Sequence, residues 1–179
     1  MTITDLQARK LDRAFDHFDF NRDDLIERGD FAELGERFLL GFGHQPSSGR
    51  GQNLIEQFDQ IWFALATELG ADSLTRADFR TGMDAAFISG NKFSPVLRPV
   101  ARTVIRLCDT DSDGQIGLAE FTIMQEAYGT APEDIATAFE MIDGDGDGQL
   151  SVTELERAMQ DFYVGRKPTA PGNWLFGEL

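Results

Sequence analysis

The sequence predicts an all-α fold in which four helix–loop–helix units form two pairs within one compact domain, with short β contacts between the paired loops. Three observations support this prediction. Two acidic twelve-residue windows, 109–120 and 143–154, repeat the same residue types thirty-four residues apart. A third, similar window occupies 19–30, and apolar residues flank all three at one fixed spacing. The chain of 179 residues, 41% hydrophobic, is long enough to bury a core between these units.

The two strongest windows have the residue pattern of an EF-hand calcium loop. Ca²⁺ binds six to eight oxygens, so the loop has to converge carboxylates that repel one another. The pattern supplies side chains at positions one, three and five, a carbonyl at seven and a carboxylate at twelve. The predicted ligands are Asp109, Asp111, Asp113, the Gln115 carbonyl and Glu120, and in the later window Asp143, Asp145, Asp147, the Gln149 carbonyl and Glu154. An acidic surface turn without metal is the alternative, and the repeat disfavours it.

The first unit is predicted to begin with a helix over 5–18 and to continue into the window DFNRDDLIERGD. Its candidate ligands are Asp19, Asn21, Asp23, the Leu25 carbonyl and Asp30. Asp24 replaces the glycine of the bend, and Asp30 replaces the closing glutamate with a side chain shorter by one methylene. Because a shorter carboxylate has difficulty giving both oxygens, we expect a metal site that discriminates weakly between Ca²⁺ and Mg²⁺. The alternative is a vestigial loop kept for helix pairing.

The second unit has no run of acids at alternate positions, so it can be located only by the apolar residues that flank each loop at a fixed spacing. We expect a helix over 31–40, a Gly-, Ser- and Pro-rich surface loop over 41–53 and a helix over 54–67. This spacing is matched in the second unit by Phe63, Ala66, Leu74 and Phe79. The second loop would then be 67–78, and two of the three side chains at its ligand positions carry no oxygen. We predict a non-binding hand retained for packing, with Ile26 facing Leu74 as Ile116 faces Leu150.

A break at residues 89–95 separates the halves, which predicts a first pair of hands within 1–90 and a second pair within 95–164. Helices are expected over 96–108 and 152–164, with Pro132 in the first turn of a third. The tail, 165–179, contains Trp174, Leu175 and Phe176. Exposed, these would form a sticky patch, so we expect them to fold onto the core, with disorder as the alternative.

Charge and motifs narrow the possible functions. Acidic residues outnumber basic ones 31 to 16, and −11 of the formal charge of −15 lies in the three windows, where cations could neutralise it. This balance argues against nucleic acid or an anionic membrane as partner. No apolar run suits a signal peptide or a membrane span, which predicts a cytoplasmic protein. Cys108 is expected to be a buried thiol, and His17 and His44 accompany no nucleophile motif, so nothing favours an enzyme.

These residues together resemble the calerythrin and sarcoplasmic calcium-binding protein family. The resemblance rests on four hands with a degenerate second loop, a high phenylalanine content, and the segments FDFNRDDLIERGDF, CDTDSDGQIGLAEF and DFYVGR. It implies a bacterial, cytoplasmic protein of the calerythrin type. The family's metal ligands would fall on the residues named above in loops one, three and four.

Two functions remain open at this point. A calcium buffer or signal modulator would hold three ions, accept Mg²⁺ especially in the first hand, and work as a monomer. A calmodulin-like sensor would open its helix pairs and expose an apolar surface to a protein target. Sensor grooves favour flexible methionines, whereas this chain has five Met and fifteen Phe. The composition therefore favours the buffer.

Overall fold

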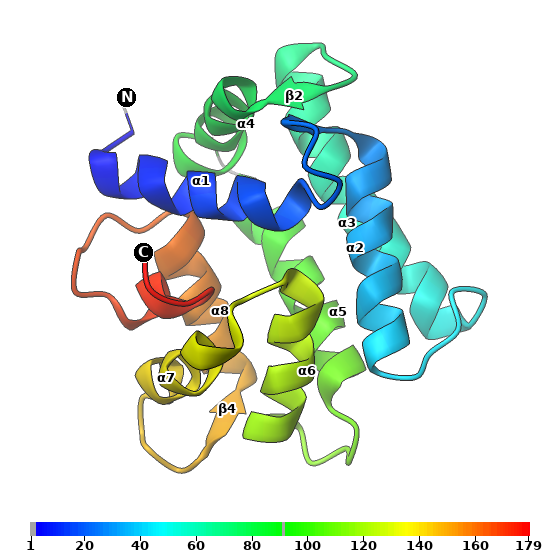
Figure 1. Ribbon diagram of the computed structural model, residues 1–179, viewed down its shortest axis with the longest axis vertical. Helices are drawn as coiled ribbons and strands as arrows, with labels where there is room; N and C mark the ends of the chain where they lie inside the picture. Colours follow the sequence, from blue (N-terminus) through cyan, green and yellow to red (C-terminus); the bar gives the residue numbers. More distant parts are fainter. Residues whose placement is uncertain (1–2, 91) are drawn as a thin grey trace.

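The structure is a computed structural model that describes residues 3–90 and 92–179. Its helices and strands run in the order α1 (Asp5–Phe18), β1 (Leu25–Ile26), α2 (Arg28–Gly41), α3 (Gly49–Leu69), β2 (Leu74–Thr75), α4 (Arg76–Met83), α5 (Arg98–Cys108), β3 (Gln115–Gly117), α6 (Leu118–Tyr128), α7 (Pro132–Ile142), β4 (Gln149–Ser151) and α8 (Val152–Tyr163). Wide helical turns over Asp84–Ile88 and Phe93–Leu97 join the halves, and a short 3₁₀ turn covers Pro171–Trp174. Residue 91, within the predicted break, lies outside the described residues. Figure 1 shows the helices packed around a common centre.

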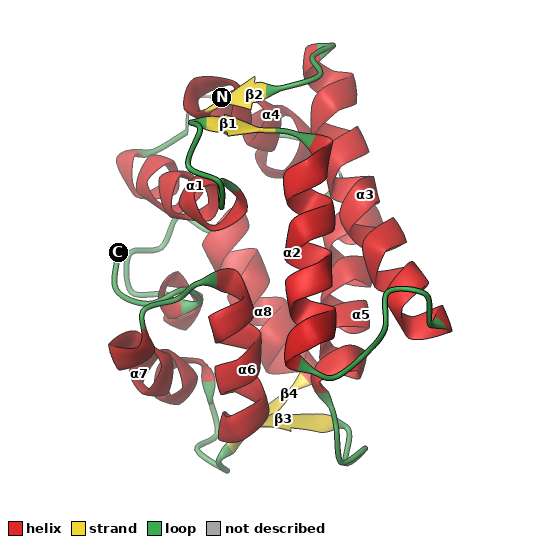
Figure 2. Ribbon diagram, turned by 45° about the vertical axis from the view of Figure 1, so that its right-hand side comes forward, coloured by secondary structure: helices red, strands yellow, loops and turns green. Residues whose placement is uncertain are grey.

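The predicted loop contacts are present, and they confirm an all-α fold of paired hands. Strands β1 and β2 are antiparallel with Ile26 opposite Leu74, and β3 and β4 place Ile116 opposite Leu150. All four side chains are fully buried, so each strand pair also closes one end of the core. Figure 2 shows the two strand pairs at opposite ends of the molecule.

The predicted surface loop over 41–53 is wrong in its second half, because α3 begins at Gly49. Ser48 caps this helix, accepting a hydrogen bond from the Gly51 N–H at 3.1 Å. A Cβ at Gly51 would lie 2.4 Å from the Gln45 carbonyl oxygen, so the glycine permits a close backbone approach. Gly51, one of the glycines that indicate a flexible loop in the sequence, thus permits close packing at a helix start.

The predicted register of the second hand is correct at its end and wrong at its beginning. Leu74 and Phe79 are fully buried, but Phe63 is 46% exposed, and Trp62 and Leu65 take the inward positions instead. Helix α3 also continues through Leu69, so the predicted loop positions one and three are helical. The interval from Leu65 to Phe79 is one residue longer than the interval from Phe18 to Phe31. An inserted residue therefore changes the entrance to the second loop.

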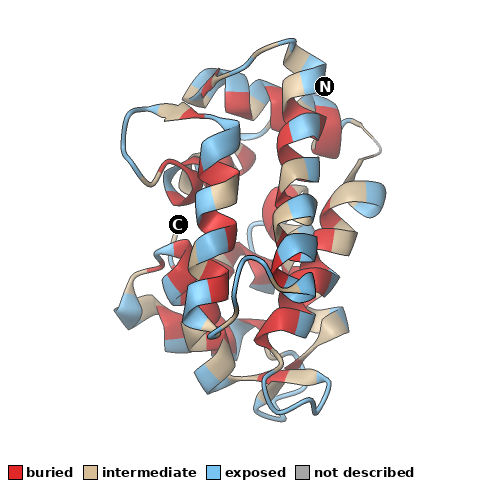
Figure 3. Ribbon diagram, turned by 90° about the vertical axis from the view of Figure 1, so that its right-hand side faces the viewer, coloured by how far each residue is buried: buried red, intermediate tan, exposed pale blue. Residues whose placement is uncertain are grey.

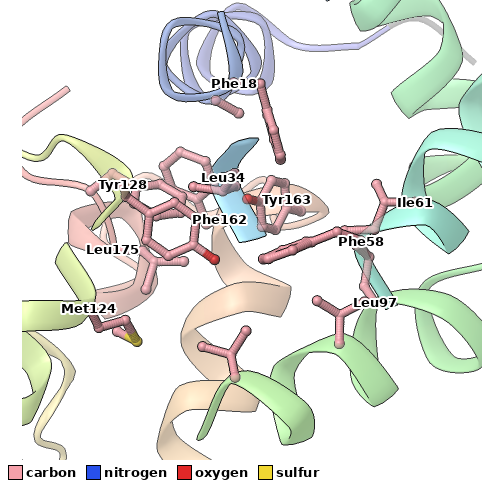
Figure 4. Close-up of a cluster of buried hydrophobic side chains, with 14 of the residues drawn as sticks. Phe18, Leu34, Phe58, Ile61, Leu97, Met124, Tyr128, Phe162, Tyr163 and Leu175 are labelled. Carbon is pink, nitrogen blue, oxygen red and sulfur yellow. The ribbon is translucent and has the colours of Figure 1, made fainter. Parts of the chain in front are cut away.

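The two halves share one continuous hydrophobic core. Helix α2 packs against α6, and α3 packs against α5. The Tyr128 ring contacts Phe38 at 4.9 Å and Phe176 at 4.8 Å between centroids, so it joins the first half, the second half and the tail. Figure 4 shows Tyr128 beside Phe162, Tyr163 and Leu175. In Figure 3 the buried segments face inward and the exposed segments follow the outer helix faces and loops.

A fully buried lysine links the first helix to the last one. The Lys10 ammonium donates to the Asp161 carbonyl at 2.6 Å, the Gly165 carbonyl at 2.8 Å and Asn173 Oδ1 at 3.2 Å. It thereby satisfies carbonyls at and just beyond the C-terminal end of α8, where a helix favours a cation. Burial lowers the pKa of Lys10 to about 8, although the nearby Asp161 carboxylate opposes this shift.

Candidate metal centre

Loops one, three and four share one backbone path. In each, the entering helix ends one residue before position one, at Phe18, Cys108 and Ile142. The sixth residue then turns the chain through positive φ: 62° at Asp24, 86° at Gly114 and 81° at Gly148. Its N–H donates to the position-one carboxylate, at 3.1 Å to Asp19, 3.1 Å to Asp109 and 2.9 Å to Asp143. The path depends on this bend and bond, and aspartate supports it as glycine does.

The position-five carboxylate completes the turn in the same way in all three loops. It accepts the N–H of the residue whose carbonyl is the predicted ligand at seven, with distances of 2.9 Å from Leu25, 2.8 Å from Gln115 and 2.8 Å from Gln149. At position three, a side-chain oxygen of Asn21, Asp111 or Asp145 accepts the backbone N–H of position five. The acids at positions three and five of the third and fourth loops hold the backbone with one oxygen only, so the other oxygen is left for a cation. Both oxygens of Asp19 and of Asp143 accept backbone N–H groups.

The closing residue distinguishes the first loop from the other two. One Glu120 oxygen accepts the Gly117 N–H at 3.0 Å, and the other reaches across the loop to the Thr110 N–H and hydroxyl, both at 2.7 Å. Glu154 does the same, with Ser151 at 2.9 Å and Gly144 at 2.8 Å. Each glutamate therefore spans its loop from position nine to position two.

Asp30 makes only the first half of this bridge. It accepts the Glu27 N–H at 2.6 Å, which corresponds to position nine. The N–H at position two, on Phe20, bonds instead to the Phe18 carbonyl at 2.9 Å. The missing methylene therefore leaves the two ends of the first loop unconnected by the closing side chain.

The pKa values of the closing residues also distinguish the first loop from the third and fourth loops. Burial raises the pKa of Asp30, the Asp23, Asp19 and Glu27 carboxylates add to the rise, and the Glu27 N–H opposes it. Burial would also raise the pKa of Glu120, but the hydrogen bonds from Thr110 and Gly117 outweigh it and the pKa is lowered. The pKa of Glu154 is lowered against burial in the same way, mainly by Ser151 and Gly144. The glutamates are thus better prepared to stay ionised than Asp30.

The carboxylates of the third and fourth loops converge as a cation site requires. Oxygens of Asp109, Asp111 and Glu120 lie within 4.8 Å of one another, as do those of Asp143, Asp145 and Asp147. Asp109 Oδ1 is buried and has no hydrogen-bond partner among the described residues. Clustered acids with an unpaired buried oxygen fit a hard cation such as Ca²⁺. In the part of the first loop that the structure describes, no three carboxylates come this close.

Thr110 has a role that the sequence analysis did not identify. It binds one oxygen of Glu120 through both its N–H and its hydroxyl, and so fixes the closing carboxylate. Ser151 likewise donates to the Glu154 carboxylate. The sequence does indicate this contact, because Ser-x-x-Glu is the pattern of a capping box, here at the start of α8. No short pattern links Thr110 to a partner ten residues away.

Comparisons with known proteins also point to calcium-binding EF hands. A family model described as EF hand matches residues 135–159, from within α7 into α8. Calerythrin of Saccharopolyspora erythraea is 33% identical over 168 residues, which cover 91% of this chain and 95% of that protein. The sarcoplasmic calcium-binding protein of Perinereis vancaurica tetradentata is 27% identical over 131 residues, or 73% of this chain and 74% of that protein.

A solved structure agrees over most of the chain. The calcium-binding protein of Streptomyces coelicolor, described in the context of prokaryotic calcium-mediated regulation, superposes with a TM-score of 0.76 at 27% identity, covering 90% of this chain and 99% of that one. The relatives found are EF-hand calcium-binding proteins, and the four-hand fold with converging loop acids agrees with them. The chain belongs to the calerythrin and sarcoplasmic calcium-binding protein family.

Proposed function

We propose that the protein is a cytoplasmic calcium buffer or signal modulator with three EF-hand sites. The ligands would be those predicted in loops one, three and four, and the first site would also accept Mg²⁺. The second hand would bind no ion and would serve to pair with the first. No enzymatic role enters the proposal, since the acids of the loops are arranged around points that a cation can occupy.

The observation that carries the choice of buffer over sensor is the position of the tail. Leu175 and Phe176 are 3% and 2% exposed, and the Phe176 ring packs against His17, Tyr128 and Phe162 with centroids 4.8 to 4.9 Å apart. The cavity left beside them has a volume of only about 20 Å³. A partner's anchoring side chain would need much more room than this, which supports a buffer over a sensor.

Calcium binding should contribute to folding free energy. Without an ion, four carboxylates in the third loop and four in the fourth repel across a few ångströms. Three bound Ca²⁺ ions would change the formal charge from −15 to −9 and remove this repulsion. Since the loops determine the angle between their flanking helices, the ions should stabilise the whole pair.

The test is a calorimetric Ca²⁺ titration of the calcium-free protein, with and without millimolar Mg²⁺, read beside a fluorescent probe of exposed apolar surface. A buffer gives three sites, strong competition by Mg²⁺ and no rise of the probe signal. A rise of the signal as hands three and four fill would support the sensor instead. Sedimentation of the loaded protein would check the expected monomer.

A pair of variants calibrates the probe. Phe176→Ala should open the tail site, cost about 3–5 kcal/mol of stability and give a strong probe signal without added calcium. Phe63→Ala is the matched control, because Phe63 is 46% exposed and its loss should cost less than about 1 kcal/mol. Equal probe signals in both variants would mean that the tail does not cover a groove.

A further inference from the structure

The C-terminal end of α6 is held by side chains from the first half of the molecule. This helix ends at Tyr128, and the last carbonyls of a helix have no partner inside it. His17 Nδ1 donates to the Tyr128 carbonyl at 2.6 Å, and Arg37 Nη2 donates to that of Glu126 at 3.2 Å. Figure 2 shows α2, which carries Arg37, beside α6. The exit helix of the third hand is therefore capped by residues of the first hand.

Phe20, at position two of the first loop, lies at the same place. The guanidinium carbon of Arg37 is 3.1 Å from the centroid of the Phe20 ring. Arg37 Nη1 is buried without a hydrogen-bond partner among the described residues, so the ring face compensates this group. A Cβ at Gly129, the cap residue of α6, would lie only 3.2 Å from Phe20 Cζ. We call the group His17, Phe20, Arg37 and Gly129 the α6 junction.

Position two is also the point at which the first loop closes differently from the others. In the third and fourth loops the closing glutamate accepts the N–H of position two. In the first loop Asp30 binds only the N–H of position nine, and the Phe20 N–H bonds to the Phe18 carbonyl at 2.9 Å. The side chain of Phe20 therefore holds position two from outside the loop, against Arg37 and the end of α6.

Helix α6 connects this junction to the third loop. Glu120, the closing ligand predicted for that loop, lies in the first turn of the helix. The 11 residues of α6 rise by about 1.5 Å each, so they form a rod about 16 Å long with the third loop at one end and Phe20 at the other. Ca²⁺ binds both oxygens of the closing glutamate in such a loop, which would fix the direction of the rod. The far end of the rod would then be fixed as well.

We propose that Phe20 and Arg37 are positioning residues for the first metal site and couple its affinity to the third loop through α6. An ion in the third loop orients α6, the α6 junction then holds Phe20, and position two is fixed without help from Asp30. By linkage, an ion in the first loop raises the calcium affinity of the third loop by the same factor. The inference rests on the proposed calcium function, because it concerns two of the three sites.

Calcium titrations of ¹⁵N-labelled full-length variants test the role of Phe20, with the amide at position six of each loop reporting its own site. Phe20→Ala should weaken calcium in the first loop by roughly tenfold, and Phe20→Leu by less. A change of less than about twofold in the fourth loop shows that the variant is folded. Phe63→Ala is the matched control, because Phe63 also has an arginine of α2 over its ring, Arg28 at 5.2 Å, but lies outside the α6 junction. It should change the first loop by less than about twofold.

Arg37 separates positioning from simple charge by the sign of the effect. Arg37→Gln removes a cation near the first loop, so charge repulsion alone predicts tighter calcium there. Loss of the α6 junction predicts several-fold weaker calcium instead. Arg37→Lys keeps the charge but loses the planar guanidinium, so it should also weaken the site, by less than Arg37→Gln. Tighter calcium in Arg37→Gln, or equal effects of Phe20→Ala and Phe63→Ala, would overturn the inference.

The third loop is then emptied to test the coupling. Glu120→Gln should weaken calcium in the first loop several-fold in the original protein, but by less than about twofold in the Phe20→Ala background. Equal losses in both backgrounds would refute the coupling. If the first loop binds no ion at all, the proposed function fails there, yet a Phe20 amide that shifts as the third loop fills still supports the connection through α6. A Phe20 amide that does not shift would overturn it.

Discussion

The first and third loops follow the same backbone path but close differently. Both bend through positive φ at position six and bond that N–H to the first aspartate at 3.1 Å. Glu120 then ties position nine to position two, whereas Asp30 reaches position nine alone. The comparison teaches that the polar side chains at positions one, three and five determine the loop's shape, while the length of the closing side chain determines whether its ends are held together.

The largest effect should come from removing the closing charge in the complete loops. Glu120→Gln and Glu154→Gln keep the side-chain length but lose the anion, so each should weaken calcium at its own loop by at least about 100-fold and lower the melting temperature in calcium. Calorimetry should then report one tight site fewer. Glu126→Gln, outside the loop on the same helix as Glu120, is the control. Three tight sites in both loop variants would refute the ligand assignment.

Exchanging the closing residues tests the length argument in both directions. Asp30→Glu should reach position two of the first loop and improve its preference for Ca²⁺ over Mg²⁺ by roughly tenfold. Glu120→Asp should make the third loop behave like the first, with a comparable loss. Competition titrations with both ions measure the two changes. Selectivity that is the same before and after the exchange would mean that chain length is not the cause.

A smaller effect is expected from replacing the positive-φ residue at position six of the loop. Asp24 adopts φ of 62°, which costs an L-residue about 1 kcal/mol that glycine avoids. Asp24→Gly should therefore stabilise the calcium-free first loop by less than about 1 kcal/mol, because glycine also loses more entropy on folding. Gly148→Asp is the reciprocal variant and should destabilise. Thermal unfolding in chelator compares them, and a loss of stability in Asp24→Gly would contradict the strain argument.

The smallest effect concerns pH and lies outside the loops. The pKa of Lys10 is lowered to about 8 by burial, so above pH 8 the unfolded chain binds more protons here than the folded protein. Stability relative to a Lys10→Met variant should therefore rise from pH 7.5 to 8.5 and continue to rise towards the usual lysine pKa. Denaturant unfolding of both proteins provides the measurement. A difference between them that stays constant over this range would show that Lys10 does not titrate as the structure indicates.

The sequence predicts most of this fold because the EF-hand loop is a local motif. The strand register at Ile26 and Ile116 follows from the position of one apolar residue in each loop. The entrance of the second hand could not be placed, since an inserted residue moves Trp62 inward and Phe63 outward while leaving the apolar composition unchanged. The start of α3 at Gly49 was missed for a different reason, because glycine indicates both flexibility and close approach.

The acids that converge in the third and fourth loops were also predictable from the sequence, but the features that distinguish the loops were predictable only in part. The shorter side chain of Asp30 is visible in the sequence, and the bridge that it fails to make is not. The two halves of the molecule meet where α2 packs on α6 and α3 packs on α5, so residues that are distant in sequence become neighbours only in the folded chain. Patterns of local spacing in the sequence do not predict which distant helices pack together.

The burial of Lys10 also bears on the order in which the chain can fold. Gln7 donates to the Val164 carbonyl at 2.9 Å, and the partners of Lys10 lie at Asp161, Gly165 and Asn173. During synthesis the first helix therefore waits for nearly the last residues before it can bury this cation. Closing so long a loop is entropically costly and slow. The first helix, although made first, can form these contacts only after the residues near the end of the chain have been made, so a chain shortened at its end should leave Lys10 without partners.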